Sequence, residues 1–197
     1  MENSFVKVDP GFFLNFACLI LLIPMKLIFA WAIAVVVHEL SHLVALRLCG
    51  VNVSAIRLSA AGMQICTGAM DAWKELVCAI AGPAGGFCLL FAARWLPCTA
   101  IFACVHSLYN LLPIFPLDGG RALRCVLIEL CGVRLGERIS AVIGGLVYGI
   151  VFALMIYLSW IFAAPVIVIC FLCAVLISCF RRKIPCKPSQ EIVQYDK

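Results

Sequence analysis

The chain has 197 residues, of which 65% are hydrophobic and 13% are charged. Ordinary soluble domains carry about 25% charged residues, so this composition excludes a soluble globular protein and predicts an integral membrane protein. The net charge of +5 indicates no nucleic-acid partner, because the cations lie where membrane topology places them. The 13 cysteines indicate no disulfide framework, since most lie in apolar runs, where a thiol behaves as a small hydrophobe.

The apolar runs predict an all-α polytopic membrane protein with about six transmembrane helices. A span needs about 20 apolar residues, and the first run is short by this measure. In chain order the expected spans are 11–24, 26–48, 72–96, 98–114, 138–158 and 160–180, with a short helix at 121–131. Gly50 is a suitable stop for the second span, and Asp71 is a suitable N-cap for the third.

Two stretches between the spans are not typical of transmembrane helices. Residues 51–70 are β-branched and small but too polar to span, which predicts a short hairpin or a re-entrant loop. The stretch from Asn110 to Arg121 contains two prolines and two glycines, which predict a break in the fourth helix. Non-helical backbone at membrane depth is tolerated only where it lines a cavity or is covered by protein.

The distribution of basic residues predicts the topology. Arg181, Arg182 and Lys183 follow the last expected span, and an even number of spans then places both termini in the cytoplasm. We expect residues 1–183 to form one transmembrane core and 184–197 a short cytoplasmic tail, with no CBS or PDZ domain. The membrane is expected to be a bacterial inner membrane or one that surrounds a forespore.

The second expected span carries the motif His38-Glu39-Leu-Ser-His42. Residues four apart lie on one face of a helix, so the two imidazoles can share one metal ion. Ionisable groups at membrane depth cost roughly 2.5–3.5 kcal/mol each and therefore indicate function. Two imidazoles that are hydrogen-bonded by neighbouring helices are the structural alternative.

Catalytic zinc takes three protein ligands and one water, so a third ligand is needed. Asp118, in the broken segment, and His106, deeper in the fourth span, are the candidates. We favour Asp118, although an Asp-Gly pair is also common in turns, and a helix–helix hydrogen bond would explain His106. Other divalent ions also suit these ligands.

Peptide hydrolysis at such a site needs a base and an oxyanion donor. Glu39 can accept the proton of a zinc-activated water. Asn110 has a side chain suited to donate to the oxyanion, and an amide that caps the broken helix end is an equally good explanation of it.

These residues resemble a known family. The motif at 38–42, followed by Asn110-Leu-Leu-Pro-Ile-Phe-Pro-Leu-Asp118-Gly-Gly-Arg, is similar to the site-2 proteases, which are intramembrane zinc metalloproteases, and most similar to their stage IV sporulation protein FB branch. The resemblance implies one Zn²⁺ per chain held by His38, His42 and Asp118. It implies Glu39 as the catalytic base and Asn110 as a stabiliser of the oxyanion.

The resemblance also implies a substrate-binding segment, and the sequence departs from the family at three positions. The segment Gly62-Met63-Gln64 is similar to the membrane-associated hairpin of that family, whose edge can pair with an unwound substrate as an added strand. Ser41 stands where the family often has glycine, Phe115 where this branch often has proline, and Gly86 where asparagine is common. These departures bear on the shape of the pocket and remove no catalytic group.

The expected function is hydrolysis of a peptide bond in or near a membrane segment of a protein substrate. A membrane-tethered sigma-factor precursor during sporulation is the substrate that the branch implies, and a membrane-protein regulator is a possible further partner. The sequence does not predict an oligomeric state. The alternatives are a metal-binding transporter or channel without protease activity and an inactive scaffold. A transporter would need further polar residues inside the spans, and the spans contain very few.

Overall fold

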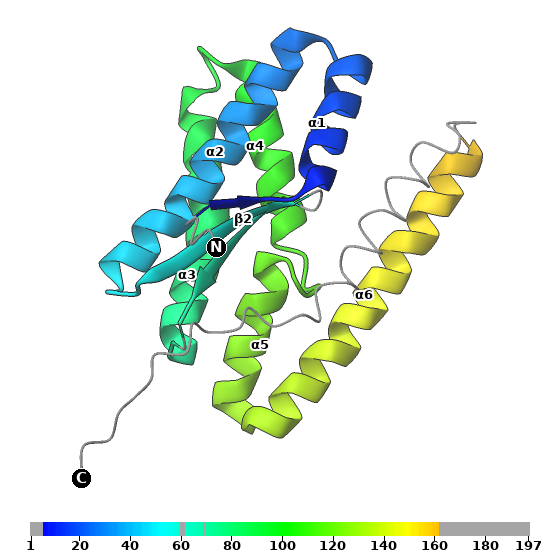
Figure 1. The fold of residues 1–197 in the computed structure, drawn as a ribbon. Helices are drawn as coiled ribbons and strands as arrows, with labels where there is room; N and C mark the ends of the chain where they lie inside the picture. Colours follow the sequence, from blue (N-terminus) through cyan, green and yellow to red (C-terminus); the bar gives the residue numbers. More distant parts are fainter. Residues whose placement is uncertain (1–5, 60–61, 69, 162–197) are drawn as a thin grey trace.

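The computed structural model describes residues 6–59, 62–68 and 70–161. The helices α2 (Met25–Leu48), α3 (Ala72–Cys88) and α4 (Pro97–Asn110) pack on one another and form the centre of the molecule. The helix α5 (Asp118–Cys131) packs on α3, and α6 (Val133–Ile161) runs back beside α5 (Figure 1). The remaining helices are α1 (Pro10–Leu22) and the short 3-10 helix η1 (Leu89–Ala92).

The helix α2 agrees with the predicted span within one residue at its start. Its 24 residues extend over about 36 Å at 1.5 Å per residue, which exceeds the roughly 30 Å of a bilayer core. Gly50 ends the helix in the left-handed conformation, with a φ of 68°. The N–H groups of Gly50 and Val51 donate to the carbonyls of Arg47 and Leu46 at 3.1 and 2.9 Å, which is the Schellman arrangement.

Three helices of the described residues are long and apolar enough to cross a membrane: Met25–Leu48, Ala72–Ala92 and Val133–Leu154. The predicted total of six is not shown. The helices α1 and α4 have only 13 and 14 residues, and the predicted span 160–180 lies almost entirely outside the described residues. The helix α6 is also longer at both ends than the predicted span 138–158.

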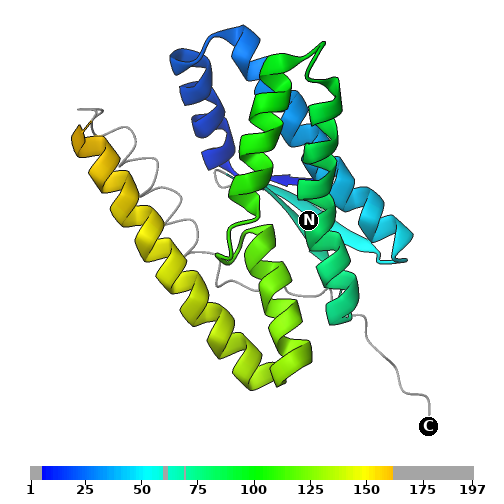
Figure 2. The same cartoon turned by 180° about the vertical axis from the view of Figure 1, so that it is seen from behind.

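The predicted hairpin is present, and it belongs to a small sheet that corrects the all-α prediction. The strands β2 (Val53–Ser59) and β3 (Gly62–Thr67) pair antiparallel, and β1 (Val6–Val8) pairs parallel with β2, in the order β1-β2-β3. The sheet lies on one side of the helices (Figures 1 and 2). The strand β1 was not predicted, because three residues carry no hydrophobic period and the partner of β1 is about 50 residues away.

The chain between α4 and α5 is irregular, as predicted, but α5 begins at Asp118 rather than at 121. Gly119 and Gly120 make this earlier start possible. A Cβ on Gly119 would collide with the carbonyl of Leu111, and a Cβ on Gly120 would collide with the backbone of Ile114. The first turn of α5 therefore packs directly against the irregular backbone and brings Asp118 towards the bundle.

The start of α3 confirms the position of Asp71 as N-cap residue, but its side chain makes no capping hydrogen bond. The helix continues through Pro83 to Cys88 and passes into η1, which ends at Ala92, short of the predicted end of the span at 96.

Candidate metal centre

The two histidines of the motif lie on the inward face of α2. His38 and His42 are buried, with 2% and 7% of their surfaces exposed, and their Nε2 atoms are 3.2 Å apart. This placement follows from the four-residue spacing on a helix. The same side of α2 faces α3 and α4, so both imidazoles are removed from lipid.

Asp118 joins the histidines from a position far along the chain. Its Oδ2 atom lies 3.1 Å from Nε2 of His38 and 3.1 Å from Nε2 of His42, and the residue is buried. The three ligand atoms form a nearly equilateral triangle. The alternative third ligand, His106, is not part of this triangle.

The triangle fits a bound metal ion. The three side chains can each offer one ligand atom within 4.8 Å of the others. Ligands about 2.0–2.1 Å from a tetrahedral zinc are about 3.3–3.4 Å apart, close to the 3.1–3.2 Å observed. Two imidazoles and a carboxylate are also a donor set that catalytic zinc uses, with a fourth position left for water.

The tautomer of His42 supports the same arrangement. Its Nδ1 lies 2.7 Å from the carbonyl oxygen of Cys78, and a carbonyl can only accept, so Nδ1 carries a proton. A neutral His42 therefore presents the lone pair of Nε2 to Asp118 and His38. Lone pairs this close repel one another unless a proton or a metal cation lies between them, and one divalent metal ion would satisfy all three at once.

Glycine at position 82 lets α3 approach the imidazoles. A Cβ on Gly82 would lie 2.7 Å from Nε2 of His38 and would collide with the ring of His42. Gly85 and Gly86 act likewise one turn on, where added Cβ atoms would collide with Ser41 and Ser107. Small residues on α3 thus permit close helix packing at the face that carries His38 and His42.

A chain of charged groups extends from Asp118 to the surface. Nη1 of Arg121 lies 3.8 Å from Oδ1 of Asp118, and Nε of Arg121 donates to Glu75 on α3 at 3.4 Å. Arg124 lies 3.8 Å from Glu75 and donates to Glu137 on α6 at 2.8 Å. The Asp118 carboxylate thus turns one oxygen to the histidines and the other to a basic side chain.

Glu39 lies beside the triangle, and Asn110 is linked to it through His106. Glu39 is half-buried and close enough to His38, His42 and Asp118 to interact electrostatically with each of them. Asn110, at the end of α4, donates from Nδ2 to His106 Nε2 at 3.1 Å and to the carbonyl of His106 at 2.9 Å. The ring of His106 in turn contacts His38, with 4.7 Å between centroids.

The predicted substrate segment lies in β3, away from these contacts. Gly62, Met63 and Gln64 pair with Ser59, Leu58 and Arg57 of β2, and β3 is an edge strand of the described sheet. No hydrogen bond or ion pair between described residues joins Met63 or Gln64 to the triangle.

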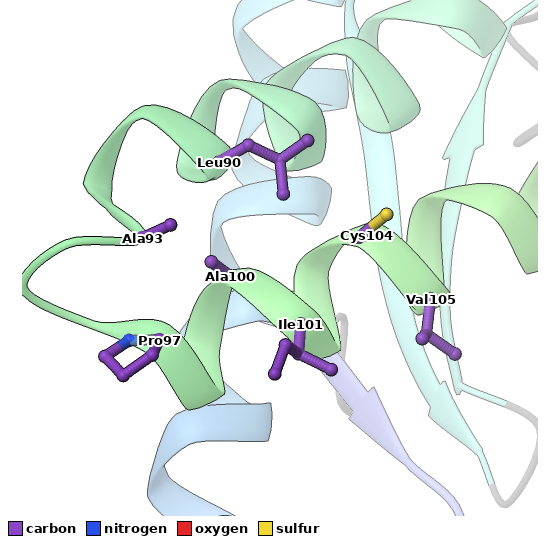
Figure 3. A pocket seen from close by; sticks show the side chains of 7 residues that line it. All are labelled: Leu90, Ala93, Pro97, Ala100, Ile101, Cys104 and Val105. Carbon is purple, nitrogen blue, oxygen red and sulfur yellow. The ribbon is translucent and has the colours of Figure 1, made fainter.

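Two other features of the described residues carry no comparable chemistry. An apolar hollow of about 350 Å³ lies between η1 and α4, lined by Leu90, Ala93, Pro97, Ala100, Ile101, Cys104 and Val105 (Figure 3). It holds no ionisable group apart from the thiol of Cys104. On α5, burial raises the pKa of the Cys125 thiol to about 11, and Glu75 adds to the rise, so this cysteine is no thiolate nucleophile at neutral pH.

Sequence reasoning missed three neighbours of the triangle: the Cys78 carbonyl, the Arg121–Glu75 pair and the edge-to-face contact of His106 with His38. A signal existed for the last one. His106 and Asn110 are four residues apart, so they share one helix face, and a role for Asn110 at the site would bring His106 to it as well.

Comparison of the sequence and the fold with known proteins indicates the class of protein. No protein-family model matches the sequence. A curated relative, the zinc metalloprotease MJ0392 of Methanocaldococcus jannaschii, is 30% identical over 126 residues, which cover 57% of this chain and 37% of the relative. The chain thus spans well under half the length of that relative. The fold and the buried triangle are those of an integral membrane protein related to zinc metalloproteases.

The solved structures make the relationship more specific. The site-2 protease from Methanocaldococcus jannaschii has a similar structure, with a TM-score of 0.63 and 25% sequence identity over 89% of this chain and 87% of that one. Both matches support the relationship to the site-2 protease family that the motifs predict. Neither of them distinguishes the sporulation branch from the rest of the family.

Proposed function

We propose that this chain is an intramembrane zinc endopeptidase that hydrolyses a peptide bond in or near a membrane segment of another protein. The observation that carries the proposal is the triangle of His38 Nε2, His42 Nε2 and Asp118 Oδ2, with sides of 3.1–3.2 Å, buried among apolar helices. The likeness to a zinc metalloprotease and to a site-2 protease supports the same activity.

In the proposed mechanism His38, His42 and Asp118 hold the metal. When bound, zinc supplies Lewis acidity and makes water nucleophilic at neutral pH. Glu39 accepts the proton of the attacking water as its oxygen bonds to the carbonyl carbon of the substrate. Glu39 then delivers this proton to the leaving nitrogen as the C–N bond breaks, so that a carboxylic acid and an amine result.

Asn110 donates from Nδ2 to the carbonyl oxygen of the substrate as negative charge develops there. The amide has two N–H groups: one keeps its bond to His106 Nε2, and the other exchanges the His106 carbonyl for the substrate oxygen. Removing one such donor from an enzyme typically costs about 10²–10³ in kcat. In the structure Nδ2 of Asn110 points to His106, so its amide is held on the side of α4 that faces His38.

The substrate is proposed to bind as an added strand along β3, at Gly62, Met63 and Gln64. A peptide bond inside a helix is shielded by its own hydrogen bonds, and a substrate must unwind before water can reach it. An edge strand offers the unwound backbone new partners, and β3 is such an edge in the described sheet.

The resemblance to the sporulation branch supports a more specific proposal. The substrate is proposed to be a membrane-tethered sigma-factor precursor, and a membrane-protein regulator is proposed as a partner. The basic residues support cytoplasmic termini and a metal centre in the cytoplasmic half of the membrane.

The proposal is tested with purified protein in liposomes that contain a membrane-tethered candidate precursor. We expect cleavage that stops when a chelator removes the metal and returns when zinc is added, with product masses that map the cut to the membrane segment or its edge. Zinc flux across the liposomes without cleavage of any precursor would instead favour the transporter.

A further inference from the structure

The two histidines of the triangle are oriented in different ways. His42 is fixed by a hydrogen bond from Nδ1 to the Cys78 carbonyl at 2.7 Å. The Nδ1 atom of His38 is buried and has no hydrogen-bond partner in the described part of the chain. Metal-binding histidines usually donate their second ring nitrogen to an acceptor that fixes the ring. His38 therefore needs another source of orientation.

Ring packing supplies this orientation. The His38 ring contacts two other imidazoles, with centroids 4.9 Å from His42 and 4.7 Å from His106 and interplanar angles of 79° and 80°. Edge-to-face contacts of this kind are favourable between aromatic rings. His42 is itself a ligand, so His106 is the non-ligand ring that limits the rotation of His38.

Small residues on α4 bring His106 to this position. Ala103 and Ser107, which flank His106 on the helix, are 1% and 0% exposed. A Cβ on Gly86 of α3 would collide with the Ser107 hydroxyl. The close packing of α4 thus fixes the backbone from which His106 reaches the His38 ring.

The other side of His106 acts on a second functional group. Its Nε2 lies 3.1 Å from Nδ2 of Asn110, one helical turn further along α4. An amide nitrogen can only donate, so this ring nitrogen accepts. One imidazole thus contacts both a predicted metal ligand and the predicted oxyanion donor.

We propose that His106 is a positioning residue that sets the His38 ring for metal binding and sets the Asn110 amide for the substrate oxygen. The inference rests on the proposed function and adds to it a residue outside the two motifs. The contact with His38 depends on the ring of His106, whereas the contact with Asn110 depends on one ring nitrogen. Two substitutions therefore separate the two roles.

His106→Phe keeps a ring beside His38 and removes the acceptor for Asn110, whereas His106→Gln keeps an acceptor and removes the ring. We expect His106→Phe to bind zinc within about threefold of wild type but to lose about tenfold or more in kcat. We expect His106→Gln to bind zinc about 10–100-fold more weakly and to regain most of kcat at saturating zinc.

Zinc affinity is measured by competition with a chromophoric chelator, and kcat and KM are measured at saturating zinc. Leu108→Ala is the control, because Leu108 lies on the same helix and is 55% exposed, and it should match wild type in both readouts. In an Asn110→Ala background, His106→Phe should cause no further loss of kcat.

Parallel losses of affinity and kcat in both variants would overturn the inference, because a merely structural role produces that pattern. Wild-type zinc affinity in both variants would also overturn it. If the wild type binds zinc but does not cleave, the result contradicts the proposed protease activity alone. The zinc affinities of the variants then still test the contact between His106 and His38. A wild type that binds no zinc contradicts the proposed function, and the inference with it.

Discussion

Substitution of Gly82 by alanine tests whether the metal centre depends on the close approach of α3. The added Cβ would lie 2.7 Å from Nε2 of His38, whereas ordinary contact begins at 3.4 Å. The His38 ring would have to withdraw by about 0.7 Å, since packed interiors offer little free space, and the His42 ring would have to withdraw further. Functional metal sites hold ligand distances within about 0.2 Å.

The expected magnitudes differ for stability and for metal binding. Overpacking costs about 1–3 kcal/mol, and replacing a helical glycine by alanine returns up to about 1 kcal/mol, so the free energy of unfolding should fall by about 0–2 kcal/mol. Zinc affinity should fall by about 100-fold or more, which is about 2.7 kcal/mol, because two of three ligands move.

The assay is zinc affinity by chelator competition together with thermal unfolding in detergent. Gly145→Ala is the matched control, because this glycine lies in α6 with nothing within 4 Å of an added Cβ. It should leave zinc affinity unchanged and slightly raise stability. Zinc affinity equal to wild type in a folded Gly82→Ala protein would refute the reasoning.

Three further predictions test the triangle and its neighbours. Gly85→Ala should destabilise the protein by about 1–3 kcal/mol, and adding Ser41→Gly should restore most of the loss in thermal unfolding, because the new Cβ would collide with Ser41. No recovery in the double variant would exclude this pairing. Asp118→Asn should weaken zinc binding by about tenfold or more, or about 1.4 kcal/mol, because the ligand loses its charge; unchanged affinity would remove Asp118 from the ligand set. Arg121→Gln should weaken zinc binding by about tenfold, because Oδ1 of Asp118 loses its ion pair at 3.8 Å, and Glu75→Gln should act in the same direction but less. If neither changes the affinity, the charged chain does not orient the ligand.

Local signals in the sequence were sufficient for the elements that carry the motifs. The apolar run of α2 and the stop at Gly50 are both local, and the structure reproduces them. The composition of 51–70 predicts a hairpin or a re-entrant loop, and the structure contains the hairpin. The break after Asn110 was predicted because prolines and glycines oppose a helix. These elements depend little on distant residues.

Features that depend on distant partners were not predicted. The strand β1 is defined by its pairing with β2, and α5 begins early because Gly119 and Gly120 fit against the backbone of 111–115. In the site, the ligand spacing along α2 was predictable from helix geometry. The four-residue spacing of His106 and Asn110 indicates that His106 lies near the site, but its contact with His38 requires knowing how α4 packs on α2.

The central claim is that the buried triangle binds zinc for hydrolysis with Glu39 as the base. The most direct measurement is zinc per chain and precursor cleavage on the same samples of wild type and Glu39→Gln. The account predicts about one zinc in both proteins, with cleavage reduced by about 10²–10⁴ in the variant, because Glu39 is not a ligand. Cleavage that survives Glu39→Gln, or a wild type without zinc, would contradict it.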